Sequence, residues 1–237
     1  MRQAIRFTYS QFSQSALPIL KLMDRVTSET PAALRNSDLF AQHKSIQLGS
    51  VVLISGYLES FLRAVCETYF AELARKGFGM SNLGDEYLSI HLREGAGHLA
   101  DLVKREQRKK KPFSESSAFV RRLVAPILDN TKSPVWEAFA RTQGNPSPEV
   151  VKAILKALGI KGGFDVIETA LDGKYSSNTL ATLLTNLNEI RNECAHTGTA
   201  SSVPSPGAIK DLVQYTRHLT LGICRVVDNK ISQITTP

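Results

Sequence analysis

Two side chains suited to phosphate chemistry lie five residues apart near the end of a predicted helix. They are Arg191 and His196, in the segment Leu187–Gly198, LNEIRNECAHTG. An arginine stays protonated and presents a planar set of donors to phosphate oxygens. A histidine titrates near neutral pH and can therefore accept or donate a proton. Together the two groups could stabilise charge on a phosphodiester and move the proton of an attacking hydroxyl.

The spacing alone leaves a second interpretation open. A cationic Arg and His near the C-terminus of a helix also offset the helix dipole. On a regular helix five steps rotate about 500°, which leaves residues 191 and 196 about 140° apart around the axis. Thr197-Gly198 predicts that the helix ends at or near His196, which would let the imidazole approach Arg191. A second copy of the chain across a two-fold axis could also complete the site.

The elements that must position this segment are helices. Apolar residues recur at three-and-four spacing along most of the chain, and no run alternates as a strand would. We expect long helices at about residues 11–28, 41–76, 177–196 and 206–230. Shorter helices are expected between about residues 80 and 163. The predicted fold is therefore all-α: a single helical domain over residues 1–237, with a bundle core at about 11–76 and 177–230 and a helical insertion at about 80–163.

Proline positions predict several helix ends. Ser133-Pro134, Ser147-Pro148 and Ser205-Pro206 each predict a helix start, because a serine hydroxyl can cap free amides and proline fits the first turn. Pro18 lies inside the first predicted helix, so that helix is expected to start late or to kink there.

Composition restricts the class of protein. The chain has 237 residues, 42% of them hydrophobic, which is enough for a full core. Its three cysteines form no CxxC pair, which argues against a disulfide framework and a cysteine zinc site. The most apolar run, residues 48–58, is about half of what a membrane span needs. We therefore expect a soluble, cytoplasmic protein without a secretory signal.

A basic run accounts for most of the net charge of +7. It consists of Lys104, Arg105, Arg108, Lys109, Lys110 and Lys111. Such a run predicts a surface that binds phosphates along an RNA strand. The alternative is a solvated helix end before Pro112, where cations also offset the dipole.

Two segments together resemble the HEPN superfamily. The first is Arg191-Asn192-Glu193-Cys194-Ala195-His196, which matches the signature of an Arg, a polar residue and a His a few residues later. The second is SGYLESFLRAV, Ser55–Val65, which resembles the second helix of these proteins. The resemblance covers about residues 11–76 and 177–230.

The resemblance implies an all-helical, metal-independent endoribonuclease that uses no cofactor. It implies that Arg191 holds the phosphate and His196 moves the proton, and that Asn192 and Glu59 support them. Asn192 could equally be a solvent-facing amide, and Glu59 a helix-surface partner of Arg63. It further implies a homodimer acting on RNA, with tRNA among the candidate targets. A toxin or anti-phage role, with an antitoxin protein as inhibitor, would fit. Gly198 replaces the tyrosine that some HEPN toxins carry for modification.

Other functions remain as alternatives. The chain could be a non-catalytic helical adaptor that binds RNA or a protein. The segment Gly144–Gly159 resembles one helix of a DNA-binding regulator. The simpler interpretation is a capped structural helix. His91 and His98 lie beside apolar residues and are interpreted as packing residues rather than metal ligands. Cys194 lies on the leucine stripe and is interpreted as a core residue rather than a nucleophile.

Overall fold

The computed structural model describes residues 1–141, 145–197 and 203–234, and for residues 195–197 it describes the backbone only. Over this part of the chain the fold is all-α, with eight α-helices, two short 3-10 turns and no strand, as predicted. The helices are α1 (Gln3–Ala33), α2 (Ser37–Arg75), α3 (Asp85–Arg108), α4 (Ser114–Leu128), α5 (Pro148–Ala157), α6 (Phe164–Ala170), α7 (Ser177–Thr197) and α8 (Pro206–Gln233). The 3-10 turns are η1 (Met80–Asn82) and η2 (Trp136–Ala138).

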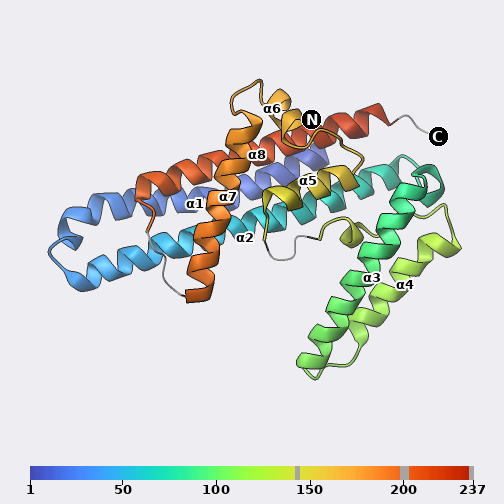
Figure 1. Ribbon diagram of the computed structural model, residues 1–237, viewed down its shortest axis with the longest axis horizontal. Helices are drawn as coiled ribbons and strands as arrows, with labels where there is room; N and C mark the ends of the chain where they lie inside the picture. Colours follow the sequence, from blue (N-terminus) through green and yellow to red (C-terminus); the bar gives the residue numbers. More distant parts are fainter. Residues whose placement is uncertain (142–144, 198–202, 235–237) are drawn as a thin grey trace.

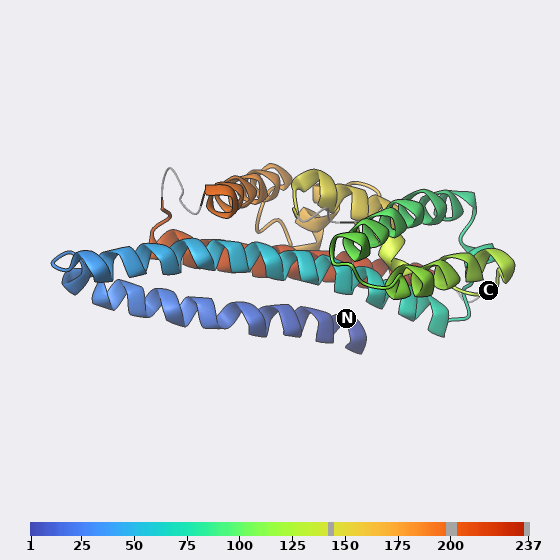
Figure 2. The same cartoon turned by 90° about the horizontal axis from the view of Figure 1, so that it is seen from below.

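Three long helices form the centre of the molecule. α1 and α2 make an antiparallel hairpin, and α8 packs against both and runs in the direction of α2 (Figure 1). α7 crosses α8 and then α2 (Figure 1). Seen from below, α5, α6 and α7 cover one face of α2 and α8, with α1 on the other face (Figure 2). One large apolar cluster joins these helices.

The bounds of α2 follow from local chemistry. The Oδ1 of Asn36 accepts hydrogen bonds from the amides of Asp38 at 3.0 Å and Leu39 at 3.1 Å, which caps the first turn. After the last turn Gly77 takes a φ of +82°, a conformation that costs glycine little. The helix predicted at about 41–76 is confirmed, with an earlier start at Ser37.

The predicted bounds of the first helix were wrong. α1 begins at Gln3 and continues through Pro18. Its first turns are held by α8: Ile5 is fully buried, and the amide of Arg2 donates to Oδ1 of Asp228 at 2.8 Å. Because this support is tertiary, the local sequence did not reveal it.

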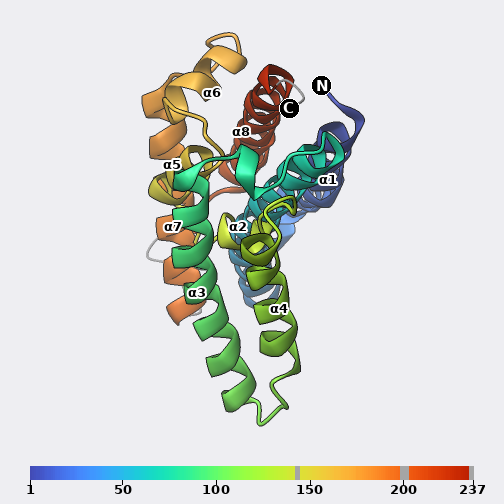
Figure 3. The same ribbon diagram turned by 90° about the vertical axis from the view of Figure 1, so that its right-hand side faces the viewer.

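The prediction of only short helices at about 80–163 was also wrong, because α3 has 24 residues. Gly95 and Gly97 both lie inside this continuous helix, and each marks a close approach of another side chain. A Cβ at Gly95 would collide with the Leu123 side chain of α4, and one at Gly97 with the guanidinium of Arg141. α3 and α4 form a hairpin that projects from the bundle (Figures 1 and 3). A second, small apolar cluster lies there, made of Leu102, Phe119, Leu123 and Val135.

Two of the three predicted Ser-Pro helix starts are confirmed. Ser147 accepts from the amide of Val150 at 3.3 Å at the start of α5, and Ser205 from that of Ala208 at 3.1 Å at the start of α8. The prediction of a helix start at Ser133-Pro134 was wrong, since only the 3-10 turn η2 follows it. The Ser133 hydroxyl instead donates to the carbonyl of Phe78 at 2.8 Å, so it does not cap a helix.

α2 is apolar enough to meet a length-and-composition test for a membrane span, with an 18-residue window of mean hydropathy 1.4. In the fold, 44% of that window is buried. The buried apolar side chains of α2 belong to the large apolar cluster shared with α1, α7 and α8. A core helix of a bundle passes the same test, so the result is weak evidence for a membrane.

Candidate active site

The Arg191 side chain lies near the end of α7 and is held by its neighbour. Its Nη1 donates to Oδ1 of Asn192 at 3.0 Å. Both residues are half-buried, so the guanidinium is restrained but still reachable from solvent. A donor set restrained in this way loses less entropy when it binds a phosphate oxygen.

The His196 side chain lies outside the described residues. Its backbone belongs to α7, which ends at Thr197, as the sequence predicted. Positions 191 and 196 therefore lie on one continuous helix, about 140° apart around its axis. Gly198, the position that departs from the tyrosine of some HEPN toxins, lies outside the described residues as well.

A buried amide one turn before Arg191 was missed by sequence reasoning. Asn188 is only 5% exposed. Its Nδ2 and Oδ1 have no hydrogen-bond partner within the described part of the chain. Buried amides are nearly always paired, because leaving one unpaired costs free energy. An Asn three residues before Arg191, beside the Leu184 and Leu187 stripe, was the available signal.

Cys194 is buried, consistent with its interpretation as a core residue. It is 9% exposed, and burial raises the pKa of its thiol. A raised pKa lowers the thiolate fraction at neutral pH, and only the thiolate is strongly nucleophilic.

Glu59 lies on α2, the helix against which α7 packs. Its Oε1 lies 2.7 Å from Nη2 of Arg63, four residues later on the same helix. The Glu59 side chain is 21% exposed and that of Arg63 53%. The helix-surface pair is therefore formed, and a role for Glu59 at the Arg191 site stays a prediction.

The basic run lies at the tip of the projecting α3–α4 hairpin. Lys104, Arg105, Arg108, Lys109, Lys110 and Lys111 are all exposed at the end of α3 and in the turn that follows. Arg105 pairs with Glu115 of α4, and the buried Glu106 accepts from the amide of Glu115 at 2.8 Å, which fixes the start of α4. The hairpin and the end of α7 extend from the same side of the long helices (Figures 1 and 2).

The histidines of α3 pack within the insertion, as interpreted. His91 is fully buried; its Nε2 donates to the carbonyl of Leu123 at 2.8 Å, and its Nδ1 accepts from the amide of Val135 at 3.3 Å. The ring of His98 packs on that of Phe119, with centroids 4.8 Å apart. Among the described residues no group of three or more His, Cys, Asp or Glu side chains could hold a metal ion.

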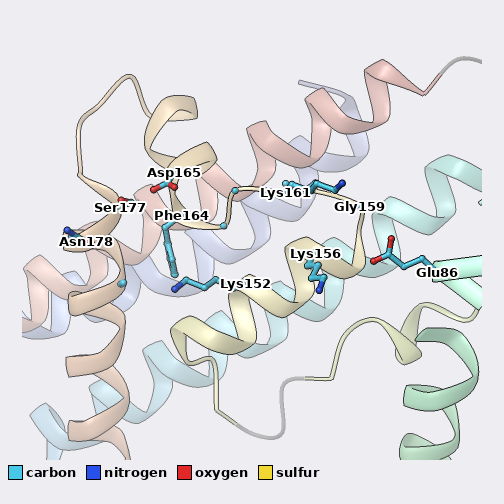
Figure 4. A pocket seen from close by; sticks show the side chains of 13 residues that line it. Glu86, Lys152, Lys156, Gly159, Lys161, Phe164, Asp165, Ser177 and Asn178 are labelled. Carbon is cyan, nitrogen blue, oxygen red and sulfur yellow. The ribbon is translucent and has the colours of Figure 1, made fainter. Parts of the chain in front are cut away.

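A surface hollow of about 550 Å³ lies at the opposite end of α7 from Arg191 (Figure 4). Lys152, Lys156 and Lys161 line it, and Nζ of Lys152 lies 5.8 Å from the ring centroid of Phe164. Ser177 and Asn178, the first residues of α7, close one side. None of the predicted site residues lines this hollow.

Taken together, the described helices form an all-α bundle in which a crossing helix carries the Arg–polar segment near its C-terminal end. The model of the RiboL-PSP-HEPN family matches residues 27–233, and the chain belongs to this family. The match includes the insertion and the bundle from the end of α1 onward, and leaves out residues 3–26 of α1. No curated protein and no solved structure matches the chain. HEPN domains are often ribonucleases, so membership suggests an RNA-related function.

Proposed function

We propose that the protein is a metal-independent endoribonuclease whose active site contains Arg191 and His196. The observation that carries the proposal is the segment Arg191-Asn192-Glu193-Cys194-Ala195-His196 at the end of α7, in a chain that the HEPN family model matches over residues 27–233. Both residue types are those that phosphodiester cleavage without a metal requires.

In the proposed reaction His196 takes the proton of a ribose 2′-hydroxyl. The resulting oxygen attacks the adjacent phosphorus, and the bond from phosphorus to the 5′-oxygen breaks. Arg191 stabilises the charge that builds on the non-bridging oxygens. The departing 5′-oxygen takes up the proton that His196 removed, directly or through water, which gives a 2′,3′-cyclic phosphate and a 5′-hydroxyl and returns His196 to its neutral form. DNA would resist this reaction because it lacks the nucleophile.

We further propose that the active form is a homodimer in which two α7 helices meet. Arg191 and His196 lie about 140° apart around one helix, so two chains bring both groups to one phosphate more readily. α2, which packs against α7, supplies a candidate contact face. Gly49, Val52, Leu53 and Gly56 follow helical spacing there; Leu53 is 49% exposed, and a Cβ at either glycine would touch nothing. Such a face allows close approach of a second helix.

Cleavage of total tRNA and rRNA with EDTA present tests the proposal. The wild-type protein should cut, and Arg191→Ala and His196→Ala should each lower the rate by about 100-fold or more while the helical circular dichroism is unchanged. Undiminished cleavage by His196→Ala would reject the assignment of the base.

Mixing the two inactive variants tests the two-chain site. Random dimers of Arg191→Ala and His196→Ala chains should regain up to about a quarter of the wild-type rate if each site takes Arg and His from different chains. Leu53→Glu should give a monomer by light scattering and abolish cleavage, whereas Leu34→Glu, at an exposed loop position, should not. Cleavage by a strict Leu53→Glu monomer would reject the dimer.

A toxin or phage-defence role in the cytoplasm, restrained by an antitoxin protein, is the proposed biological setting. It predicts that expression of the wild-type chain arrests growth and that His196→Ala does not. Arrest by both variants would point away from RNA cleavage as the cause.

A non-catalytic RNA-binding adaptor is the second candidate, and the exposed basic run at the tip of the α3–α4 hairpin favours it. Cations placed on a projecting hairpin can bind phosphates without any contribution from α7. Salt-sensitive RNA binding with no cleavage in EDTA would select this function over the nuclease.

A further inference from the structure

A hollow of about 480 Å³ lies between the second half of α3, α2 and η2. We call it the α2–α3 hollow. Its lining residues come from α2, α3 and the segment around η2; those used below are Arg63, Arg105, Trp136, Glu137 and Arg141. The volume lies within the range of about 300–1,000 Å³ that small-molecule sites occupy. None of the predicted site residues except Arg105 lines it.

One part of the lining is apolar and includes an aromatic ring. Trp136 is half-buried, and beside it lie Leu102 at 8% exposure and Ala140 at 5%. A partly exposed tryptophan ring on a fixed backbone is a surface on which a nucleobase stacks favourably.

Three guanidinium groups converge on the same hollow. Arg63 and Arg105 are about half exposed, and their ion-pair partners Glu59 and Glu115 are not among the residues that line the hollow. Nη2 of Arg141 lies 3.0 Å from Oδ2 of Asp101, and its Nη1 3.2 Å from Oε2 of Glu94. Exposed ion pairs of this kind contribute little, so a phosphate can exchange for a carboxylate at Arg63 or Arg105.

A carboxylate with an unused acceptor completes the lining. Oε1 of Glu137 accepts from Nη1 of Arg122 at 2.6 Å. Its Oε2 is buried and has no hydrogen-bond partner within the described part of the chain. The side chain is 12% exposed. A buried carboxylate oxygen gains from an N–H donor, and a base with an amino group supplies one.

From these groups we propose that the α2–α3 hollow binds one nucleotide of an RNA strand, with its base on Trp136 and its phosphate at Arg63 and Arg105. Glu137 favours bases that donate to a carboxylate, guanine above all because its N1–H and N2–H₂ are adjacent donors, and disfavours uracil. The proposal rests on the proposed RNA substrate. The hollow includes Arg105 of the basic run and Arg63 of α2. An RNA strand that runs along the α3–α4 hairpin would therefore reach α2 at Arg63, one helical turn from Glu59.

Trp136 is the chain's single tryptophan, so intrinsic fluorescence reports on this hollow alone. The His196→Ala protein, which should leave RNA intact, is titrated with 5′-GMP, 5′-UMP, inorganic phosphate, a G-containing pentaribonucleotide and a uridine pentaribonucleotide. We expect GMP and the G-containing RNA to quench the fluorescence and to bind about 10-fold more tightly than their uridine counterparts. Inorganic phosphate should bind more weakly and change the fluorescence little.

Two variants and two matched controls assign the groups. Arg105→Ala should weaken every nucleotide about 5-fold or more, and Glu137→Gln should reduce the preference for G to within about 2-fold. Arg75→Ala and Glu72→Gln serve as controls, because these residues form an ion pair on α2 and Glu72 is also 12% exposed. All four variants are compared only after circular dichroism shows wild-type helicity.

The outcomes separate this proposal from the nuclease. Quenching by RNA without cleavage by the wild-type protein would support the hollow and contradict the nuclease. Cleavage without any quenching would overturn the proposal that the α2–α3 hollow binds a nucleotide, and would leave the nuclease proposal standing. Binding of GMP but not of G-containing RNA would assign the hollow to a free nucleotide and overturn the RNA proposal. Equal effects of the test variants and their controls would overturn it too.

Discussion

The guanidinium of Arg191 is hydrogen-bonded to the side chain that follows it, with Nη1 at 3.0 Å from Oδ1 of Asn192. Adjacent residues on a helix point in different directions, so this bond bends the Arg191 side chain around the helix toward Asn192. The polar position of the HEPN signature therefore has a physical role here, which is to restrain the arginine that would bind the phosphate.

Removing that restraint should affect the reaction more than the fold. Asn192→Ala is expected to lower kcat for RNA cleavage by about 10-fold, since the guanidinium must then be ordered by the substrate. Unfolding free energy should change by no more than about 0.5 kcal/mol, because the site is half-buried. Asn186→Ala, an exposed change on the same helix, is the control for both measurements. Equal rates for the two variants would contradict the role of Asn192.

Replacing Asn188 by an apolar residue should lower activity without lowering stability. Its amide is buried without a hydrogen-bond partner in the described part of the chain, which costs free energy in the folded state. Replacing it by Leu, similar in size and apolar, is expected to leave stability unchanged or raise it by about 1 kcal/mol. RNA cleavage is expected to fall by about 10-fold if the amide orients the site. Urea unfolding and a cleavage assay on the same preparation measure both. A destabilised Asn188→Leu protein with normal activity would show that the amide serves the fold.

Glu59 can be tested against a pair of the same kind on the same helix. Glu59→Gln breaks the ion pair with Arg63, and Glu72→Gln breaks the one with Arg75. Each should cost a few tenths of a kcal/mol, at most about 1 kcal/mol. Only Glu59→Gln is expected to slow RNA cleavage, by about 10-fold. If both leave cleavage unchanged, Glu59 is a helix-surface residue and nothing more.

Two histidines of the insertion, the buried His91 and the half-buried His98, should make stability depend on pH. Burial lowers the pKa of His91 and of His98, so the unfolded chain binds their protons more readily. The contribution of these histidines to the free energy of unfolding is therefore fully present above their unfolded pKa of about 6.5. It is lost as the pH falls below that value. The carboxylates with lowered pKa, such as Asp228 and Glu106, lose their contribution only at lower pH.

Urea unfolding followed by circular dichroism, between about pH 7.5 and about pH 5.5, isolates the histidines. The midpoint should fall on acidification. His91→Gln should lower stability at the higher pH by about 1–3 kcal/mol, because the hydrogen bonds to Leu123 and Val135 are weakened, and should reduce the loss on acidification. An unchanged acid dependence in His91→Gln would contradict the burial of a neutral imidazole.

Local chemistry explains which parts of the fold the sequence could predict. The Ser147 and Ser205 caps and the left-handed Gly77 depend on neighbours within a few residues, and all three helix ends were predicted. The helix start predicted at Ser133 was wrong because its hydroxyl donates a hydrogen bond to the carbonyl of Phe78, which is distant in sequence. At Gly95 the missing side chain accommodates Leu123 from α4, a contact that the local sequence does not show.

The residues of the candidate site also differ in whether local sequence or only the folded structure identifies them. Arg191, Asn192 and His196 form one short segment, so their residue types and spacing could be recognised directly. Asn188 is informative only through its burial, which depends on packing. The α2–α3 hollow draws Arg63, Arg105 and Trp136 from three separate parts of the chain. No local pattern joins these residues, and only the folded arrangement brings them together.

The central claim is that a ribose hydroxyl is the nucleophile in a reaction run by Arg191 and His196. The most direct test uses a synthetic RNA that contains one mapped cleavage site, beside the same RNA with a single 2′-deoxynucleotide on the 5′ side of that linkage. With EDTA present, the protein should cut the all-ribose strand to a 2′,3′-cyclic phosphate and a 5′-hydroxyl, and should leave the substituted linkage intact. Cleavage of the deoxy-substituted linkage at the same rate would contradict the mechanism.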